Sequence, residues 1–223
     1  MTATVLLYVG LVIAAYLLGS ISNAVWVGKA LYYIDVRQYG SKNAGTTNVL
    51  RVLGWKAALP VFILDMAKGA AAVCLVFFSA LQPETNSFVG FQILLGLTAM
   101  LGHIFPVFAG FKGGKGVATI AGVVSALHPS AMAMSLGIFA VCLLISRYVS
   151  LSSVVTALCF PFIVIVVFGK WLNVEETLTL KLFSIVAMAI ILITHRKNMM
   201  RLWRRQEGKI VFRKRPSITI PEK

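Results

Sequence analysis

Long apolar stretches alternate with short polar segments along nearly the whole chain. A helix needs about 20 apolar residues to cross the hydrocarbon core of a bilayer, and several of these stretches approach that length. We expect membrane-spanning helices at residues 5–28, 57–80, 88–108, 151–168 and 178–194. The pattern therefore predicts an all-α integral membrane protein that leaves no room for a separate soluble domain.

The apolar run at residues 117–146 is too long to be one spanning helix. As a single helix its roughly 30 residues would measure about 45 Å, against about 30 Å for the hydrocarbon core. Proline removes a backbone donor and disfavours helix at the preceding residue, so we expect a break at His128-Pro129. Two short helices, about 117–128 and 130–146, give seven transmembrane helices and bring the polar segments to one face.

Basic residues are unevenly shared between the two ends of the predicted helices. Lys and Arg recur in the segments 29–56 and 112–115, whereas the loop at Gln82-Pro83-Glu84 has neither. Because Lys and Arg concentrate in cytoplasmic loops, we place the N-terminus outside and the C-terminus in the cytoplasm. We interpret residues 1–223 as one membrane-embedded domain, with a basic cytoplasmic tail at 199–223 that anionic lipids attract.

The composition agrees with this pattern and adds a strong positive charge. Hydrophobic residues make up 59% of the 223 residues and the mean hydropathy is +0.88, which excludes an ordinary soluble domain. A net charge of +14 in a membrane protein points to phosphate-bearing substrates and the anionic inner leaflet. The basic tail has Trp203 but no interleaved aromatic series, so we expect no nucleic-acid partner. The three cysteines lie in apolar runs without ligand spacing, and we expect neither a disulfide framework nor a metal site.

A polar segment with glycines, residues 40–51, separates the first two apolar runs. Gly40 and Gly45 permit backbone conformations closed to other residues, and the side chains between them offer hydroxyl and amide donors. Arg51 supplies a planar charged fork that suits phosphate. The alternative is a solvated loop rich in turn formers. The candidate phosphate-binding residues are Ser41, Asn43, Gly45, Thr47, Asn48 and Arg51.

A second basic loop precedes the run that begins at Val117. Its residues are Lys112, Gly113, Gly114, Lys115 and Gly116. If a helix starts after Gly116, its free backbone N–H groups and dipole favour an anion beside two ammonium groups. The spacing from Gly110 to Lys115 is one residue short of a Walker A loop. The alternative is a positive-inside anchor with a tight turn.

Polar residues near the later helix ends complete the candidate site. His195 and Asn198 are three residues apart and share a face if the last helix continues through them. Each of these side chains can either donate a hydrogen bond to a phosphate or have a purely structural role. Ser150 either caps the following helix or binds substrate.

Asp65 and Lys68 lie at helical spacing inside an apolar run, where pairing lowers the cost of burying either charge. We interpret this pair as structural support beneath the first loop. For His103 two roles stay open: a structural residue at a helix end, or a functional residue.

No nucleophile stands out in the sequence. It has no GxSxG motif, and none of its three histidines is followed by Asp five residues later. A phosphate-rich site of this kind favours direct attack between two bound substrates, with the rate coming from positioning and charge stabilisation. The alternative is an anion or lipid-phosphate transporter. Against it, nearly all charges lie at predicted helix ends and no internal repeat is visible.

Seven segments resemble those of the PlsY family, the bacterial acyl-phosphate:glycerol-3-phosphate acyltransferases. They are Gly19-Ser20-Ile21, Asp35-Val36-Arg37, residues 40–54, Asp65-Met66-Ala67-Lys68-Gly69, residues 102–108, residues 111–119 and Arg147-Tyr148-Val149-Ser150-Leu151. The resemblance covers nearly the whole chain. It implies an enzyme of the bacterial inner membrane, with its site facing the cytoplasm, that performs the first step of phospholipid synthesis.

In that reaction a fatty acyl group moves from acyl phosphate to the 1-hydroxyl of sn-glycerol 3-phosphate, releasing phosphate and 1-acyl-sn-glycerol 3-phosphate. The resemblance implies no cofactor and membrane lipid as the surroundings; it leaves chain-length preference and oligomeric state open. It implies catalytic roles for Arg51, Lys115, His195 and Asn198. It implies substrate binding by Ser41, Asn43, Gly45, Thr47, Asn48, Lys112, Gly113, Gly114, Gly116 and Ser150. Glu207 and Lys209 resemble a Glu-x-Lys near the end of the family's chains.

Overall fold

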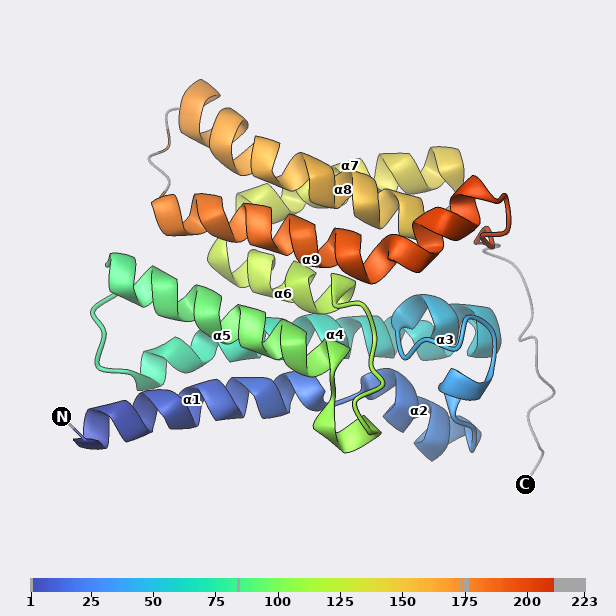
Figure 1. The fold of residues 1–223 in the computed structure, drawn as a ribbon, viewed down its shortest axis with the longest axis horizontal. Coiled ribbons are helices and arrows are strands. Elements are labelled where there is room, and N and C mark those ends of the chain that lie inside the picture. The colour runs from blue at the N-terminus through green and yellow to red at the C-terminus, as the bar shows by residue number, and fades with distance from the viewer. Residues whose placement is uncertain (1, 84, 173, 175–176, 211–223) are drawn as a thin grey trace.

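The computed structural model describes residues 2–83, 85–172, 174 and 177–210, and within these ranges the chain is helical with no strand (Figure 1). The α-helices are α1 (Thr2–Ser20), α2 (Asn23–Tyr32), α3 (Thr46–Leu53), α4 (Trp55–Cys74), α5 (Asn86–Ile104), α6 (Val117–Leu127), α7 (Pro129–Ser146), α8 (Val149–Phe162) and α9 (Leu178–Trp203). Shorter helical turns are η1 (Val36–Gln38), η2 (Leu75–Phe78), η3 (Val107–Ala109) and the π-helical η4 (Ile163–Trp171), which continues α8.

Among the described residues, six helices are long and apolar enough to cross a membrane. They are α1, α4 with η2, α5 with η3, α7, α8 with η4, and α9. The expected all-α membrane architecture is confirmed. The seventh expected helix, α6, has 11 residues and is therefore about 16 Å long, well short of the hydrocarbon thickness.

The predicted break at His128-Pro129 is confirmed. α6 ends at Leu127, and Pro129 is the first residue of α7. His128 Nδ1 accepts a hydrogen bond from the Ala131 N–H at 3.2 Å and so caps α7. Proline is favoured at this first helical position because its missing N–H has no partner there in any case.

The first expected helix, residues 5–28, is wrong in extent, because two helices occupy this stretch. α1 ends at Ser20, and α2 begins at Asn23 after a non-helical Ser22 with ψ 78°. The Ile21 carbonyl at the break accepts a hydrogen bond from Lys68 Nζ at 2.7 Å. A buried cation thus binds a carbonyl that a continuous helix would have used internally.

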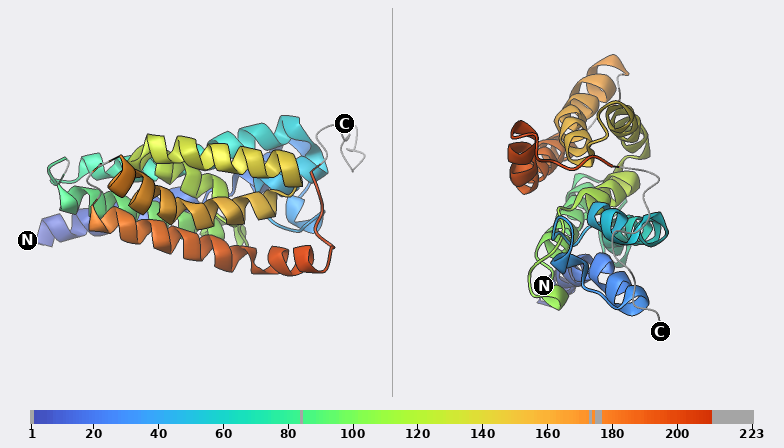
Figure 2. Two further views of the ribbon diagram at one scale, coloured as in Figure 1. Left: turned by 90° about the horizontal axis from the view of Figure 1, so that it is seen from above. Right: turned by 90° about the vertical axis from the view of Figure 1, so that its right-hand side faces the viewer.

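The long helices alternate in direction along the molecule. α1, α5, α7 and α9 run one way and α4, α6 and α8 the other, so the polar loops and the end of α9 gather at one end of the bundle (Figure 1). Figure 2 shows α7, α8 and α9 grouped beside the remaining helices, and this group joins them through contacts of α7 with α6 and of α9 with α5. The candidate functional site lies where these two groups of helices meet, at the end of the bundle that carries the polar loops.

Glycines let α4 and α6 cross with their backbones in contact. A Cβ on Gly69 would lie 2.1 Å from the Thr119 carbonyl oxygen, and one on Gly122 would lie 1.9 Å from the Met66 carbonyl oxygen. Small residues at helix crossings are a common means of close packing in membranes. This crossing fixes α6, and therefore the loop before it, against α4.

Gly122→Val is expected to destabilise the protein by about 2 kcal/mol or more, because the added atoms meet a backbone that cannot move aside. The measurement is the thermal unfolding midpoint in detergent. Gly137→Val in α7 is the matched control, since a Cβ there meets nothing within 4 Å. Equal midpoints for the two variants would contradict the close crossing.

Candidate active site

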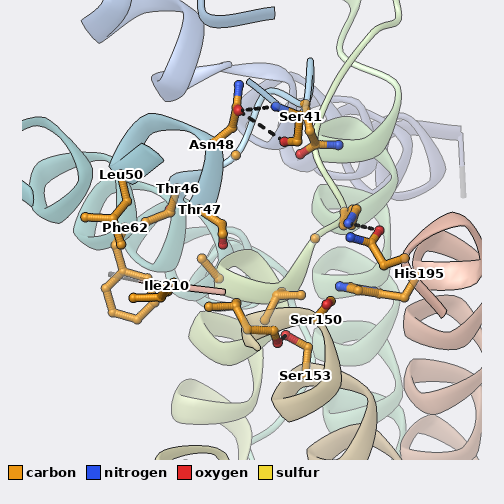
Figure 3. Close-up of a pocket in the computed structure, with 18 of the residues that line it drawn as sticks. Ser41, Thr46, Thr47, Asn48, Leu50, Phe62, Ser150, Ser153, His195 and Ile210 are labelled. Carbon is orange, nitrogen blue, oxygen red and sulfur yellow. Dashed lines mark hydrogen bonds between the residues drawn. The ribbon is translucent and has the colours of Figure 1, made fainter. Parts of the chain in front are cut away.

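A cavity of about 240 Å³ opens where the loops meet. Figure 3 shows Ser150 and His195 on the opposite side of this cavity from Thr46 and Thr47. The predicted site residues that line it are Ser41, Asn43, Gly45, Thr47, Asn48, Arg51, Lys115, Gly116, Ser150, His195 and Asn198. Segments far apart in the sequence therefore converge as the prediction required. Lys112, Gly113 and Gly114 do not line the cavity.

Asn48 holds the first loop in shape. Its side-chain Nδ2 donates to the Val36 carbonyl at 2.7 Å and to the Tyr39 carbonyl at 3.1 Å. Its Oδ1 accepts from the Ser41 N–H at 2.8 Å and from Ser41 Oγ at 3.1 Å. The amide of Asn48 is thus occupied by the loop itself.

The two glycines of the first loop have different roles. Gly40 has φ +58°, and a Cβ there would lie 2.5 Å from Asn48 Oδ1, so the expectation of a restricted backbone is confirmed. For Gly45 the same expectation is wrong, because its φ of −142° is extended and open to any residue. Gly45 precedes α3 without a side-chain capping bond, and Gly45, Thr46 and Thr47 line the cavity, so the first turn of α3 borders it.

Lys115 links the second loop to α9. Its Nζ donates a short hydrogen bond to Asn198 Oδ1, and its carbonyl accepts from Thr194 Oγ1 at 3.3 Å. Gly116 follows with φ +82° and precedes α6, so this loop leads directly into the start of a helix, as expected. The ammonium group and the first turn of α6 therefore share one side of the cavity.

The electrostatic setting of Lys115 makes its charge sensitive to pH. Burial lowers the pKa of the Lys115 ammonium to about 8. The Glu207 carboxylate opposes this shift, whereas Arg201 and Arg51 add to it. Near neutral pH Lys115 is therefore mostly charged, and it loses its proton as the pH rises through about 8.

Arg37 does not line the cavity but holds the second loop in place through hydrogen bonds to its backbone. This role was missed in the sequence analysis. Arg37 Nη1 donates to the Ala109 carbonyl at 2.6 Å and to the Lys112 carbonyl at 3.4 Å. Its Nη2 lies 2.7 Å from Asp35 Oδ2, and the hydrogen bond from Arg37 lowers the pKa of Asp35. Lys112 itself has an exposed side chain, so this loop presents its two lysines to different surroundings.

His195 and Asn198 share the inner face of α9, because this helix continues to Trp203, as the prediction required. Residues 199–203 of the expected tail are therefore helical, whereas residues 211–223 lie outside the described part of the chain. His195 Nδ1 lies 2.9 Å from the Ile191 carbonyl, which can only accept, so Nδ1 carries a proton. In the neutral ring Nε2 is then a free acceptor.

Glu207 joins three elements of the site, and the sequence analysis had noted it only through resemblance. Its Oε1 accepts from Asn198 Nδ2 at 2.8 Å and from Ser150 Oγ at 3.1 Å. The same oxygen lies 3.7 Å from Arg51 Nη2, which also donates to the Gly208 carbonyl at 2.8 Å. A sequence signal existed, since Glu207 is the only acidic residue between residues 177 and 221. Ser150 thus uses its hydroxyl here and not as a helix cap.

A second, apolar cavity of about 130 Å³ adjoins the first. It lies between α4 and α6 on one side and α7, α8 and α9 on the other. Phe62, Val117, Phe139 and Ser153 line both cavities. The polar site and the apolar cavity therefore share part of their wall.

The cavity contains no obvious metal centre. Within the described ranges, no group of three or more His, Cys, Asp or Glu side chains lies close enough together to hold an ion. The charged side chains that line it most closely are Arg51, Asp65, Lys115 and Glu207. The basic members of this set suit an anion.

Comparison with known proteins gives one consistent family. A family model described as glycerol-3-phosphate acyltransferase matches residues 9–205. The glycerol-3-phosphate acyltransferase of Chlorobaculum parvum is 40% identical over 232 residues, covering 94% of this chain and 99% of that protein. That of Chlorobaculum tepidum is 42% identical over 230 residues, covering 93% and 98%.

Two solved structures are also similar to this chain. Both are crystal structures of PlsY (YgiH), an integral membrane glycerol 3-phosphate acyltransferase, and each comparison covers 92% of this chain and 96% of that one. The glycerol 3-phosphate form is 36% identical with a TM-score of 0.77. The lysophosphatidic acid form is 35% identical with a TM-score of 0.78.

Proposed function

The chain belongs to the glycerol-3-phosphate acyltransferase family, and from this premise we propose that it transfers a fatty acyl group from acyl phosphate to the 1-hydroxyl of sn-glycerol 3-phosphate. The products are 1-acyl-sn-glycerol 3-phosphate and phosphate, and the reaction is the first step of bacterial phospholipid synthesis. The observation that carries this proposal is a basic cavity that shares part of its wall with an apolar one. Such a pair of cavities suits a lipid chain that ends in an activated phosphate.

Two phosphate groups are present during the reaction, and the cavity offers two places for them. One is formed by Arg51 and the first turn of α3, and the other by Lys115 and the first turn of α6. Helix N-termini and positively charged side chains both favour phosphate. Ser41, Asn43 and Thr47 add polar groups to the cavity wall, while Asn48 keeps the first loop in place. Lys112 acts from the rim of the site.

The acyl chain lies in the apolar cavity, with its carbonyl end at the wall that both cavities share. Ser153 and Phe160 on α8 mark two levels of this cavity, about 10 Å apart along the helix axis. The remaining length of a long chain extends past α4 and α7 toward lipid, since no close packing joins those two helices.

The acyl transfer needs no separate base, because the two substrates account for every bond and for the proton. The 1-hydroxyl oxygen bonds to the acyl carbon, and the bond from that carbon to the phosphate oxygen breaks. The hydroxyl proton ends on the leaving phosphate, whose second pKa is about 6 and whose dianion can accept it. Arg51 and Lys115 stabilise the charge that grows on this leaving group. His195 Nε2 accepts a hydrogen bond from the neighbouring 2-hydroxyl of glycerol 3-phosphate, which aims the 1-hydroxyl at the acyl carbon and leaves its proton for the phosphate.

The cavity faces the cytoplasm in this proposal. The end of the bundle that carries it is the end where the basic loops and the basic end of α9 gather. The opposite end has no Lys or Arg between residues 79 and 98. The positive-inside rule then places the site on the inner face of the bacterial cytoplasmic membrane, where water-soluble glycerol 3-phosphate is available.

The rate is expected to be greatest between about pH 6 and about pH 8. Below about pH 6 the substrate phosphates gain a proton and lose both charge and basicity. Above about pH 8 the Lys115 ammonium loses its proton in the free enzyme, so kcat/KM falls as the pH rises. A bound phosphate favours the charged lysine, so the alkaline fall in kcat should lie at higher pH.

Lys115→Arg tests this assignment, because a guanidinium stays charged at alkaline pH. The alkaline fall in kcat/KM should therefore move to higher pH. Lys115→Met should have a low kcat/KM without the alkaline fall. An alkaline fall that is unchanged in both variants would assign it to another group.

The proposed reaction is tested by phosphate release from detergent-purified protein given glycerol 3-phosphate and palmitoyl phosphate. A parallel assay follows thiol release from palmitoyl-CoA. We expect phosphate release only when glycerol 3-phosphate is present, and no thiol release. Thiol release would overturn the acyl phosphate as donor, and inactivity with both donors in folded protein would overturn the proposed reaction.

A further inference from the structure

A buried polar cluster lies beside the cavity and takes no part in the transfer described above. It consists of Asn23 at the start of α2, Asp65 and Lys68 in α4, and His103 in the last turn of α5. All four side chains are buried, and Asp65 and His103 line the cavity. Charged groups within membrane helices are costly, and they are rarely kept without a role.

The cluster converges on one atom, Asp65 Oδ1. Lys68 Nζ lies 2.9 Å from it, and Asn23 Nδ2 donates to it at 2.9 Å. His103 Nδ1 lies 3.7 Å from the same oxygen. The pairing of Asp65 with Lys68 that the spacing predicted is confirmed, and Asp65 has two further partners in the Asn23 amide and the His103 imidazole ring.

His103 meets the second loop through its backbone and through its ring. Its carbonyl accepts a hydrogen bond from the Gly114 N–H at 3.1 Å. A Cβ on Gly114 would lie 2.1 Å from His103 Nε2 and 2.9 Å from the Ala44 carbonyl oxygen. Gly114 is therefore enclosed between the imidazole ring and the first loop, so the position of this ring sets the separation of the two loops.

We propose that Asp65 and His103 are positioning residues for the phosphate groups of the substrates. Asp65 holds the imidazole ring, and the ring holds Gly114, the residue directly before Lys115. A shift of the ring therefore moves the Lys115 ammonium relative to Arg51. Hydrogen bonds and ion pairs to a phosphate weaken steeply with distance, so this support matters to the affinity for one phosphate substrate.

The inference rests on the proposed function, and two double variants test it. Asp65→Leu with Lys68→Met removes the ion pair without leaving a buried charge alone, a replacement that is often neutral for stability. Asp65→Asn with Lys68→Met has the same charge but keeps an oxygen to which Asn23 can donate and against which His103 lies. The two variants thus differ in whether residue 65 offers this oxygen to Asn23 and His103.

The first double variant is expected to raise the KM for one phosphate substrate by about tenfold and to leave the other KM unchanged. The second should keep most of the wild-type kcat/KM. The affected substrate should be the one whose KM rises in Lys115→Met. Equal kcat/KM in the two double variants, or a fall in kcat with both KM values unchanged, would overturn the positioning role.

A binding measurement separates this inference from the proposed reaction. Inorganic phosphate should raise the thermal unfolding midpoint of the wild type and of the Asn-containing double variant by similar amounts, and that of the Leu-containing one by less. If the wild type shows this stabilisation yet transfers no acyl group, the reaction fails and the positioning role stands. If phosphate stabilises all three proteins equally, the positioning role fails whatever the activity.

Discussion

Arg51→Ala is expected to lower kcat/KM by about 10²–10³-fold, the scale on which one donor to a developing negative charge contributes to catalysis. The loss has two causes. The cavity loses a guanidinium that faces substrate, and Glu207 is left buried 3.7 Å from where its charged neighbour stood. Steady-state kinetics in detergent with both substrates varied gives the number.

Arg196→Ala is the matched control for this prediction. Arg196 lies on the exposed side of α9, near the same end of the molecule, and does not line the cavity. Its removal should change kcat/KM by less than about twofold, in keeping with the small effect of exposed charges. Equal losses at both positions would show that overall positive charge, and not the guanidinium in the cavity, is what the reaction needs. Lys214, another distant basic residue, lies outside the described part of the chain.

The second large effect is expected at His195. His195→Ala should lower kcat by about 10²-fold, because the glycerol 2-hydroxyl then loses its acceptor and the 1-hydroxyl is no longer aimed at the acyl carbon. His195→Gln should keep most of the turnover, since an amide oxygen can take the place of Nε2, and it should keep the pH profile of the wild type. These results follow if phosphate receives the proton and His195 only orients the hydroxyl.

The opposite result has an equally clear meaning. If His195→Gln lost turnover as severely as His195→Ala, and its remaining activity no longer fell below about pH 6, the imidazole would be the base. Asn198→Ala serves as a comparison in the same helix. It frees Lys115 from its hydrogen bond without touching the imidazole, so it should alter the alkaline side of the profile more than the acid side.

Local signals in the sequence were sufficient for most of the fold. Pro129 marked the break between α6 and α7, and the three-residue spacing of His195 and Asn198 placed them on one helix face. The first helix was misjudged because no proline marks its interruption at Ile21. The interruption is stabilised by Lys68, which lies 47 residues further along the chain.

The sequence predicted those site residues whose role follows from their residue type. It did not predict those whose role depends on contacts between distant segments. Arg51 and Lys115 stood out as cations in glycine-rich polar segments. Glu207 did not, because its importance comes from a segment that meets Arg51 across 157 residues of sequence. The role of Arg37 was missed, and that of His103 was left open, for a related reason. Both contact the backbone of the second loop, and a backbone contact between distant segments leaves no pattern of residue types in the sequence.

The proposed use of the two adjoining cavities draws the two substrates from different phases. Glycerol 3-phosphate arrives at a concentration per volume of water, whereas the acyl donor arrives as a mole fraction of the membrane. Empty detergent micelles or lipid added at constant donor would therefore slow the enzyme by surface dilution and leave the KM for glycerol 3-phosphate unchanged. The product remains in the same two-dimensional solvent as the donor, so its accumulation in the bilayer competes directly for the apolar cavity.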